Sequence, residues 1–538
     1  MACGDSVCRL PHRTLPALHL ALKTSKITIS MPASTQAPRL TLRFARLDRA
    51  LRGDVLVVPV VIRQGKVVPP PTEGLPRELA EHAVSLAARH HGAKQPGSVD
   101  DVILPRKLPF ARLAFVGLGE ERPIKMADVR TAAAAAAEWA ARHRAAKIVL
   151  DSAVLEQLAG SDSIAAWVEG AVLSSFRFYE HRSQLQDDSR PPASTLVLAS
   201  PRGMTARARR AAEEAAVVAE CVNLARALGH EPPNVINPVT LARRAQQLAR
   251  RHKLRCRIFD ERHLKARRMG AFLAVGGGSA TPPRMIVLEH KPSRTRGRPI
   301  VLVGKAITHD TGGYSIKPTA SMVEMKYDKC GGMAVLGTMV AAARLKLPRH
   351  VIGVIGAADN AISGEAYRPG DIVRSMSGKT IEVLDTDAEG RMVLADCLHY
   401  AEKTYSPVAM IDLATLTGSC TVALGDACAG LFSTKDALAD ALLKSGELTG
   451  DRLWRMPLWP VYREQIAGAD ADLKNVGGRL AGAITAAMFL KEFVSDQTPW
   501  AHLDIAGVAN TTKQTPLCPA GATGFGVRLL VDYLRRSD

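Results

Sequence analysis

The chain of 538 residues is too long for one ordinary hydrophobic core, so we expect two or more domains. Its 47% hydrophobic and 23% charged residues, with no apolar run near the roughly 18 residues of a membrane span, exclude a wholly disordered or membrane-embedded protein. Nine cysteines without a CxxC pair form no disulfide framework, which favours a cytoplasmic protein with reduced thiols.

Residues 1–39 are predicted to be an extension, either disordered or translated from a mis-called start. Five basic residues accompany only one acid there, as in a transit peptide, but the apolar stretch LPALHLALK is too broken for the core of a secretory signal. Met31, followed by PASTQAP, could equally be the true start.

Residues 40–200 are predicted to form a first α/β domain. Apolar β-branched runs indicate strands, and alanine-rich or amphipathic runs indicate helices. Because the two alternate, the sheet should be mostly parallel with helices on its faces. The predicted strands cover residues 41–47, 54–62, 111–119, 147–154 and 194–200, and the helices cover 78–90 and 132–143.

Residues 201–230 are predicted to form a linking helix, because Pro232 and Pro233 stop a long helical pattern. Residues 231–538 then form a second α/β domain with a mixed, largely parallel sheet flanked by helices. Its predicted strands cover 284–290, 299–304, 350–358 and 408–415, with helices at 331–345 and 390–403.

The positive charge lies almost wholly in the first part of the chain. Residues 1–300 hold 47 Lys and Arg against 26 Asp and Glu, whereas residues 301–538 hold 24 and 26. Basic patches around Arg207 to Arg210 and Arg250 to Arg257 could attract phosphate backbones, so nucleic-acid binding is kept as an alternative function. We favour solvated helix faces, because no aromatic residues interleave with the basic ones.

Charged residues and glycines converge in the second domain. The strand PIVLVG is predicted to end at Lys305, which places Lys305, Asp310 and Lys317 at or beyond its carboxyl end. Ligand sites form at that edge of open α/β sheets. Asp328 follows at the start of the next predicted helix.

The segment DTDAEGR adds Asp387, Glu389 and Arg391 at alternate positions. If this stretch is extended, the three side chains leave the same face of the chain. Arg391 would also stand in the first turn of a helix, where a positive charge is unfavourable to the helix dipole. Its presence there indicates that it interacts with a nearby negative charge.

Carboxylates that converge in this way repel one another unless cations separate them. Two divalent ions, Zn²⁺, Mn²⁺ or Mg²⁺, would relieve the repulsion. An oxygen-rich set without histidine leans toward harder ions such as Mn²⁺, although zinc also accepts oxygen ligands. Two bridged ions also acidify a shared water to hydroxide near neutral pH. We therefore expect a dinuclear hydrolytic site.

The successive segments VGKAITHDTGGYSIKP, MKYDKCGG, DTDAEGR, ATLTGS, GDRLWRMPL and WAHLDIAG resemble the signatures of the leucyl (cytosol) aminopeptidase family, in its order. The resemblance covers residues 201–538 and is weaker over residues 40–200. It implies an aminopeptidase that releases N-terminal leucine and other apolar residues from short peptides.

The resemblance also implies the role of each charged residue. Lys305, Asp310, Asp328 and Glu389 would hold the tighter metal, and Asp310, Asp387 and Glu389 the looser one. Lys305 must then be a neutral amine, which bonding to a dication favours.

Two catalytic cations and a pocket follow from the same resemblance. Lys317 would polarise the scissile carbonyl, and Arg391 would hold a bicarbonate ion that shuttles the proton. The pocket for the substrate's first side chain would be lined by Met325, Thr415, Leu416, Gly418, Ala506 and Ala509.

The resemblance further implies that the protein assembles as a homohexamer.

Four positions depart from the family pattern: Ala306 for glycine, His309 for phenylalanine, Lys329 for methionine and Asp385 for asparagine. None replaces a predicted ligand, so we expect activity to be retained. We expect His309 to point away from the site and to serve packing. Asp385 could strengthen metal affinity or favour cationic substrates.

Overall fold

The computed structural model describes residues 26–28, 40–68, 70, 72–89, 95–120, 124–183, 193–293, 295 and 297–537. Apart from the short strand β1 (Lys26–Thr28), the predicted extension lies outside the described residues. No helix in the described part of the chain is long and apolar enough to cross a membrane.

The first sheet is mainly parallel, with strand order β1-β2-β8-β7-β3-β6-β5 and β4 beside β3. Strand β3 has side chains in the cores on both faces of this sheet: Val55 and Val57 face the core that includes α2 and α3, whereas Leu56 and Val58 face the core that includes α1. The strands are β2 (Thr41–Arg46), β3 (Gly53–Arg63), β4 (Lys66–Val67), β5 (Val99–Ile103), β6 (Phe110–Glu120), β7 (Lys147–Asp151) and β8 (Thr195–Ser200). The helices are α1 (Arg77–Arg89), α2 (Met126–Arg142) and α3 (Ala153–Ser174).

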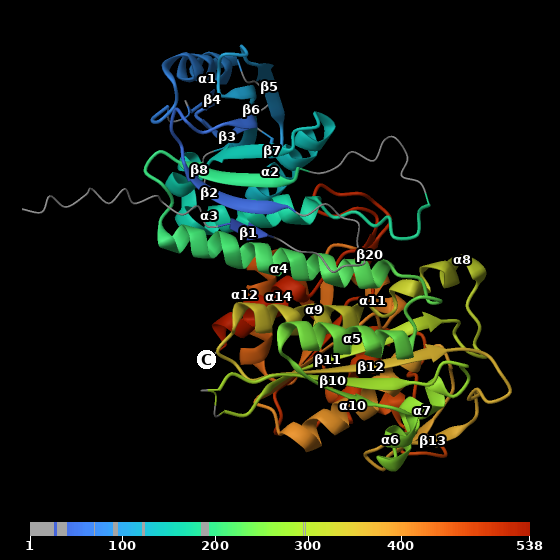
Figure 1. Ribbon diagram of the computed structural model, residues 1–538. Coiled ribbons are helices and arrows are strands. Elements are labelled where there is room, and N and C mark those ends of the chain that lie inside the picture. The colour runs from blue at the N-terminus through green and yellow to red at the C-terminus, as the bar shows by residue number, and fades with distance from the viewer. Residues whose placement is uncertain are drawn as a thin grey trace, which may run out of the picture.

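Helix α4 (Ala206–His230) joins the two halves of the molecule and runs between them (Figure 1). The Thr205 side chain caps it by accepting a hydrogen bond from the backbone N–H of Ala208. One side of α4 packs on α3 and another on α9 (Cys330–Leu345), so the helix is buried between both halves.

The second sheet is mixed, with strand order β17-β16-β19-β15-β11-β12-β10-β9. The four strands β19, β15, β11 and β12 at its centre are parallel, and antiparallel pairs flank them. This confirms the predicted α/β fold class, with a mixed, largely parallel sheet flanked by helices in the second half of the chain. The strands are β9 (Arg255–Phe259), β10 (Arg284–His290), β11 (Ile300–Asp310), β12 (Val351–Asn360), β15 (Ala409–Ala414), β16 (Ala429–Ser433), β17 (Leu453–Arg455) and β19 (Trp500–Asp504).

Helices cover both faces of the second sheet (Figure 1). Helices α5 and α9 lie on one face, and α7 and α10 on the other. The remaining elements of this half are α5 (Pro238–His252), α6 (Glu261–Ala266), α7 (Gly270–Gly276), α8 (Thr319–Met322), η2 (Val323–Tyr327), α10 (Glu389–Tyr405), α11 (Gly418–Leu424), α12 (Asp436–Thr449), η3 (Pro460–Ile466), α13 (Gly482–Lys491) and α14 (Val527–Arg536), with the short strands β13 (Ile372–Arg374), β14 (Thr380–Glu382), β18 (Leu473–Lys474), β20 (Asn510–Thr511) and β21 (Gly521–Ala522).

The start of α9 lies directly on β11 because both carry glycines at the contact. A Cβ on Gly304 would lie 2.6 Å from the Cα of Gly332, and one on Gly332 would lie 2.7 Å from the Cβ of Ala306. Side chains at these positions would push the helix off the strand. The close contact brings the segment before α9, which carries Asp328, against the middle of β11.

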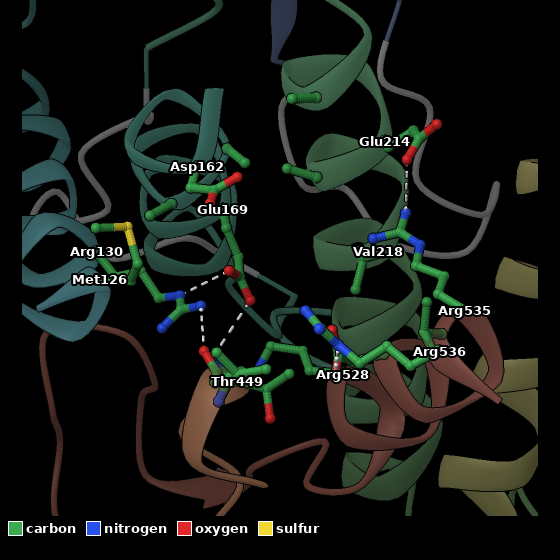
Figure 2. A pocket seen from close by; sticks show the side chains of 17 residues that line it. Met126, Arg130, Asp162, Glu169, Glu214, Val218, Thr449, Arg528, Arg535 and Arg536 are labelled. Carbon is green, nitrogen blue, oxygen red and sulfur yellow. Dashed lines mark hydrogen bonds and ion pairs between the residues drawn. The ribbon is translucent and has the colours of Figure 1, made fainter. Parts of the chain in front are cut away.

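A cavity of about 330 Å³ lies where the two halves meet, and Figure 2 shows the side chains around it. Among the side chains that line it, Glu169 accepts a hydrogen bond from Arg130 at 2.6 Å and forms an ion pair with Arg528 at 3.3 Å. Arg528 also forms an ion pair with Asp451 at 2.6 Å. This network connects α2 and α3 to α14. The arginine and acidic side chains that line the cavity are equal in number: Arg130, Arg528, Arg535 and Arg536 against Asp162, Glu169, Glu214 and Asp532.

Candidate metal centre and adjoining pocket

Strand β11 continues to Asp310 rather than ending near Lys305, so Lys305 lies inside the strand. Lys305 and Asp310 are five positions apart, and an ideal strand would point them to opposite faces. The pairing with β12 slips between Ile307 and His309, where one extra residue is inserted. This bulge restores the same face for Lys305 and Asp310, and both line one cavity.

Lys305 is almost completely buried among acceptors. Its Nζ lies 2.9 Å from Asp328 Oδ1 and 2.7 Å from Glu389 Oε1, and it donates to the carbonyl of Thr415 at 2.8 Å. Burial disfavours the ammonium, but the neighbouring carboxylates outweigh burial and raise its pKa. As a metal ligand Lys305 must lose its proton, which a dication at the same carboxylates would favour.

The Asp310 carboxylate is oriented by hydrogen bonds from the turn after β11 and from β12, the neighbouring strand. Its Oδ1 accepts from the backbone N–H of Gly312 at 2.9 Å and from Asn360 Nδ2 at 2.8 Å. Asn360 ends β12, beside the end of β11, so it belongs to the same carboxyl edge of the sheet. Sequence reasoning did not single out Asn360, although its place at a strand's end was visible.

Lys317 returns to the site because the chain turns at Gly312, whose φ of +85° suits glycine. Its backbone N–H donates to the carbonyl of Thr311 at 3.0 Å. Its Nζ lies 3.0 Å from Asp310 Oδ2 and also forms an ion pair with Asp387. The pKa of Lys317 is raised, because these carboxylates outweigh its burial.

Asp387 and Glu389 do not come from an extended stretch. Asp387 lies in a turn, and Glu389 is the first residue of α10. The expectation that alternation along a strand gathers these side chains was therefore wrong. The beginning of a helix does so instead, where a carboxylate also suits the helix dipole.

The carboxylates fit divalent cations. Ligand oxygens of Asp310, Asp387 and Glu389 lie within 4.8 Å of one another, and Asp328 Oδ2 is buried without a hydrogen-bond partner among the described residues. Burial and the charge of Asp310 raise the pKa of Glu389, and burial raises that of Asp328 to about 6. Bound cations would stabilise the ionised form of these carboxylates, and oxygen ligands suit hard ions.

The cavity that contains this cluster measures about 320 Å³. Five of the six predicted pocket residues line it: Met325, Thr415, Leu416, Gly418 and Ala506. Ala509 is buried and is not among the lining residues. Residues that sequence reasoning missed also line it: Glu324, Tyr327, Thr417, Thr421 and Asn510.

Arg391 stands apart from the cavity lining. It is buried in the first turn of α10, and its Nη1 donates to the carbonyl of Asn475 at 2.7 Å. Its Nε is buried and has no hydrogen-bond partner among the described residues. Burial lowers the pKa of Arg391, while nearby carboxylates, Glu389 first, oppose that shift.

Two of the unusual positions have defined contacts. Asp385 Oδ1 accepts from the backbone N–H of Asp387 at 2.9 Å, so it orients that predicted ligand. Lys329 is fully buried and donates to the carbonyls of Gly229 at 3.0 Å and Glu231 at 2.8 Å, at the end of α4. Burial lowers the pKa of Lys329 to about 8.

His309 and Ala306 lie outside the ligand cluster. His309 Nδ1 is buried without a hydrogen-bond partner among the described residues, and the group of possible ligands does not include it. Ala306 is buried and faces Gly332 across the contact of β11 with α9.

Lysines and carboxylates at the carboxyl edge of a mixed α/β sheet, beside an open pocket, define a candidate hydrolytic metal centre. Residues 223–531 match the catalytic domain of the cytosol aminopeptidase family, and residues 57–185 match its N-terminal domain. The chain belongs to this family. Its class is therefore that of a metal-dependent aminopeptidase.

Similar proteins agree with this assignment. Probable cytosol aminopeptidases of Geobacter sp. strain M21 and Roseiflexus castenholzii are each 46% identical, over 80% and 81% of this chain and 87% and 89% of theirs. The bottromycin maturation enzyme BotP in complex with Mn superposes with a TM-score of 0.78 at 34% identity, over 90% of this chain and 99% of its own. A mutant of tomato leucine aminopeptidase reaches a TM-score of 0.82 at 32% identity, over 94% and 98%.

Proposed function

We propose that this chain releases N-terminal amino acids, leucine and other apolar residues foremost, from short peptides. The observation that carries the proposal is the continuity of one cavity, which runs from the carboxylate cluster to a wall of small and apolar side chains. Met325, Leu416 and Ala506 on that wall suit an aliphatic side chain.

The ligands in this proposal are Lys305, Asp310, Asp328, Asp387 and Glu389, which hold two divalent ions, Mn²⁺ or Zn²⁺. When bound, the ions supply Lewis acidity for a water molecule and an anchor for the free α-amino group of the peptide. The chain contributes the geometry, because Asn360 and Thr415 donate hydrogen bonds to the carboxylates of Asp310 and Asp328. Asp385 accepts from the backbone N–H of Asp387 and so holds the main chain of a third ligand. A blocked amino terminus would lack its anchor, so the site is suited to exopeptidase action.

Lys317 is the proposed electrophile. It lines the cavity and is partly exposed to it, so its ammonium can face the scissile carbonyl and stabilise negative charge on that oxygen. Arg391 is proposed to hold a bicarbonate ion as proton shuttle. Its buried Nε has no hydrogen-bond partner among the described residues, which supports an anion at that place.

Assembly and location complete the proposal. We propose a homohexamer in the cytoplasm, by similarity to the family and to relatives named cytosol aminopeptidases. Trp454, Trp459 and Val461 are about 60% exposed, which suits a surface covered by other subunits. Light scattering after size-exclusion chromatography tests the hexamer.

Hydrolysis of leucine p-nitroanilide and of the dipeptide Leu-Gly tests the activity. We expect turnover to be lost after chelation and to return with Mn²⁺ or Zn²⁺, and Glu389→Ala to be inactive in every case. Unchanged turnover after thorough chelation, or full activity of Glu389→Ala, would refute the proposal.

Nucleic-acid binding remains a prediction for the basic first part of the chain. The exposed Arg210 on α4 is paired with Glu214 at 2.8 Å, so part of this charge is neutralised within the helix. Duplex binding measured against salt is the test, because a phosphate interface weakens steeply as salt rises.

A further inference from the structure

Glu324 is a carboxylate of the same cavity that neither the metal ligands nor the predicted pocket include. It lies in η2 directly before Met325, and it is exposed at the surface end of the cavity. Asn510 lines the cavity with it and directly follows Ala509. Glu324 and Asn510 therefore belong to the side of the cavity that would receive the first side chain of a peptide.

The charge of Glu324 is not neutralised within the cavity. The four other lining carboxylates each form an ion pair: Asp328 and Glu389 with Lys305, and Asp310 and Asp387 with Lys317. Glu324 has no ion pair with any described residue. Its hydrogen-bond partner is the neutral side-chain amide of Asn510, whose Nδ2 donates to Glu324 Oε2 at 2.9 Å. The amide fixes the carboxylate's orientation and leaves its negative charge available.

Part of the wall of this cavity is apolar or small. Met325 and Ala506 line it together with the ligand cluster and Glu324. A leucine side chain would end on that wall. An arginine or lysine side chain would cover the wall with its aliphatic stem and carry its charged head farther, toward solvent and the rim.

We propose that Glu324, oriented by Asn510, is a specificity-determining residue that recognises a cationic side chain on the first residue of the peptide. The cavity then accepts arginine and lysine as well as leucine. This inference rests on the proposed aminopeptidase activity, and it assigns to that activity a second class of substrate with its own recognition group.

Steady-state kinetics of Glu324→Gln with the p-nitroanilides of leucine, arginine and citrulline form the test. Citrulline has the shape of arginine without its charge. We expect kcat/KM for the arginine substrate to fall roughly two- to fivefold, the range for an exposed ion pair. The loss should appear in KM, because the contact is far from the reacting atoms. The leucine and citrulline substrates should be unaffected.

Glu447→Gln is the matched control, because Glu447 is an exposed carboxylate of α12 that does not line this cavity. The arginine preference should also weaken with added salt in the wild type and not in Glu324→Gln. An unchanged arginine to leucine ratio in Glu324→Gln, or an equal loss for arginine and citrulline, would overturn the proposal.

Calorimetric binding of free arginine and free leucine, the products of the reaction, provides a readout without turnover. We expect Glu324→Gln to weaken the binding of arginine alone, and equal binding by both proteins would contradict the inference. A wild type that hydrolyses no leucine substrate would instead count against the proposed function. The two failures are thus distinguishable.

Discussion

Lys305 Nζ lies 2.7 Å from Glu389 Oε1, and the residue after Glu389 determines whether they can meet. That residue is Gly390, and a Cβ built on it would stand 2.6 Å from the same nitrogen. The first turn of α10 can therefore approach β11 closely enough to bring Glu389 to Lys305 only because residue 390 lacks a side chain.

Gly390→Ala should disturb the metal site. Lys305 is buried with three partners, so it has little freedom to move away from an added methyl group. We expect Mn²⁺ affinity to fall about tenfold or more, as for changes beside a ligand. Isothermal titration with Mn²⁺ measures it. Gly364→Ala is the control, because a Cβ there meets nothing within 4 Å; equal affinities in both variants would contradict the steric account.

Asp385 is expected to act through a hydrogen bond rather than through its charge. Its Oδ1 accepts from the backbone N–H of Asp387, and an asparagine oxygen can accept the same bond. Asp385→Asn should therefore bind Mn²⁺ nearly as well as the wild type, whereas Asp385→Ala should bind it about tenfold more weakly. Equal losses in both variants would show that the charge matters instead.

The ion pairs around Glu169 should stabilise the junction between the two halves. Glu169 is buried and binds both Arg130 and Arg528, so removing its charge leaves Arg130 without its carboxylate and Arg528 with Asp451 alone. We expect Glu169→Gln to lower the free energy of unfolding by about 3–5 kcal/mol. Denaturant unfolding measures this loss. Glu81→Gln, which breaks the exposed pair of α1 with Arg77, should change stability little.

Metal-free protein should lose stability as pH rises through the weakly acidic range. Burial raises the pKa of Asp328 from 3.8 to about 6, so its folded form binds a proton more tightly than the unfolded chain does. The resulting contribution is fully present below pH 3.8 and lost as pH rises through about 6. Bound Mn²⁺ removes this loss by displacing the proton.

Thermal unfolding with and without Mn²⁺ checks this linkage. The rise in Tm that Mn²⁺ produces should be larger at about pH 7 than at about pH 5, because at the lower pH protons compete for the carboxylate. A rise of equal size at both values would contradict the shift assigned to Asp328. Asp328→Asn should reduce the dependence on pH, and Glu389, whose pKa burial also raises, should supply the remainder.

The sequence by itself determined the elements and the family. Apolar runs such as 54–62 and 111–119 specify buried strands because their side chains have no other way to leave water, and β3 and β6 lie there. The spacing of glycines and acids from 305 to 391 identified the ligand set as a family pattern, since local chemistry at fixed positions is visible without a fold. Lys305, Asp310, Asp328, Asp387 and Glu389 line one cavity.

Only the tertiary structure decided how these residues meet. The bulge before His309 depends on pairing with β12, and it alone brings Lys305 and Asp310 to the same face. Glu389 comes from the start of a helix that Gly390 lets approach, and Arg391 lies in the same first turn without lining the cavity. Glu324 and Asn510 are 186 positions apart in the chain and form one hydrogen bond. Such relationships arise from packing between distant segments, which no local pattern encodes.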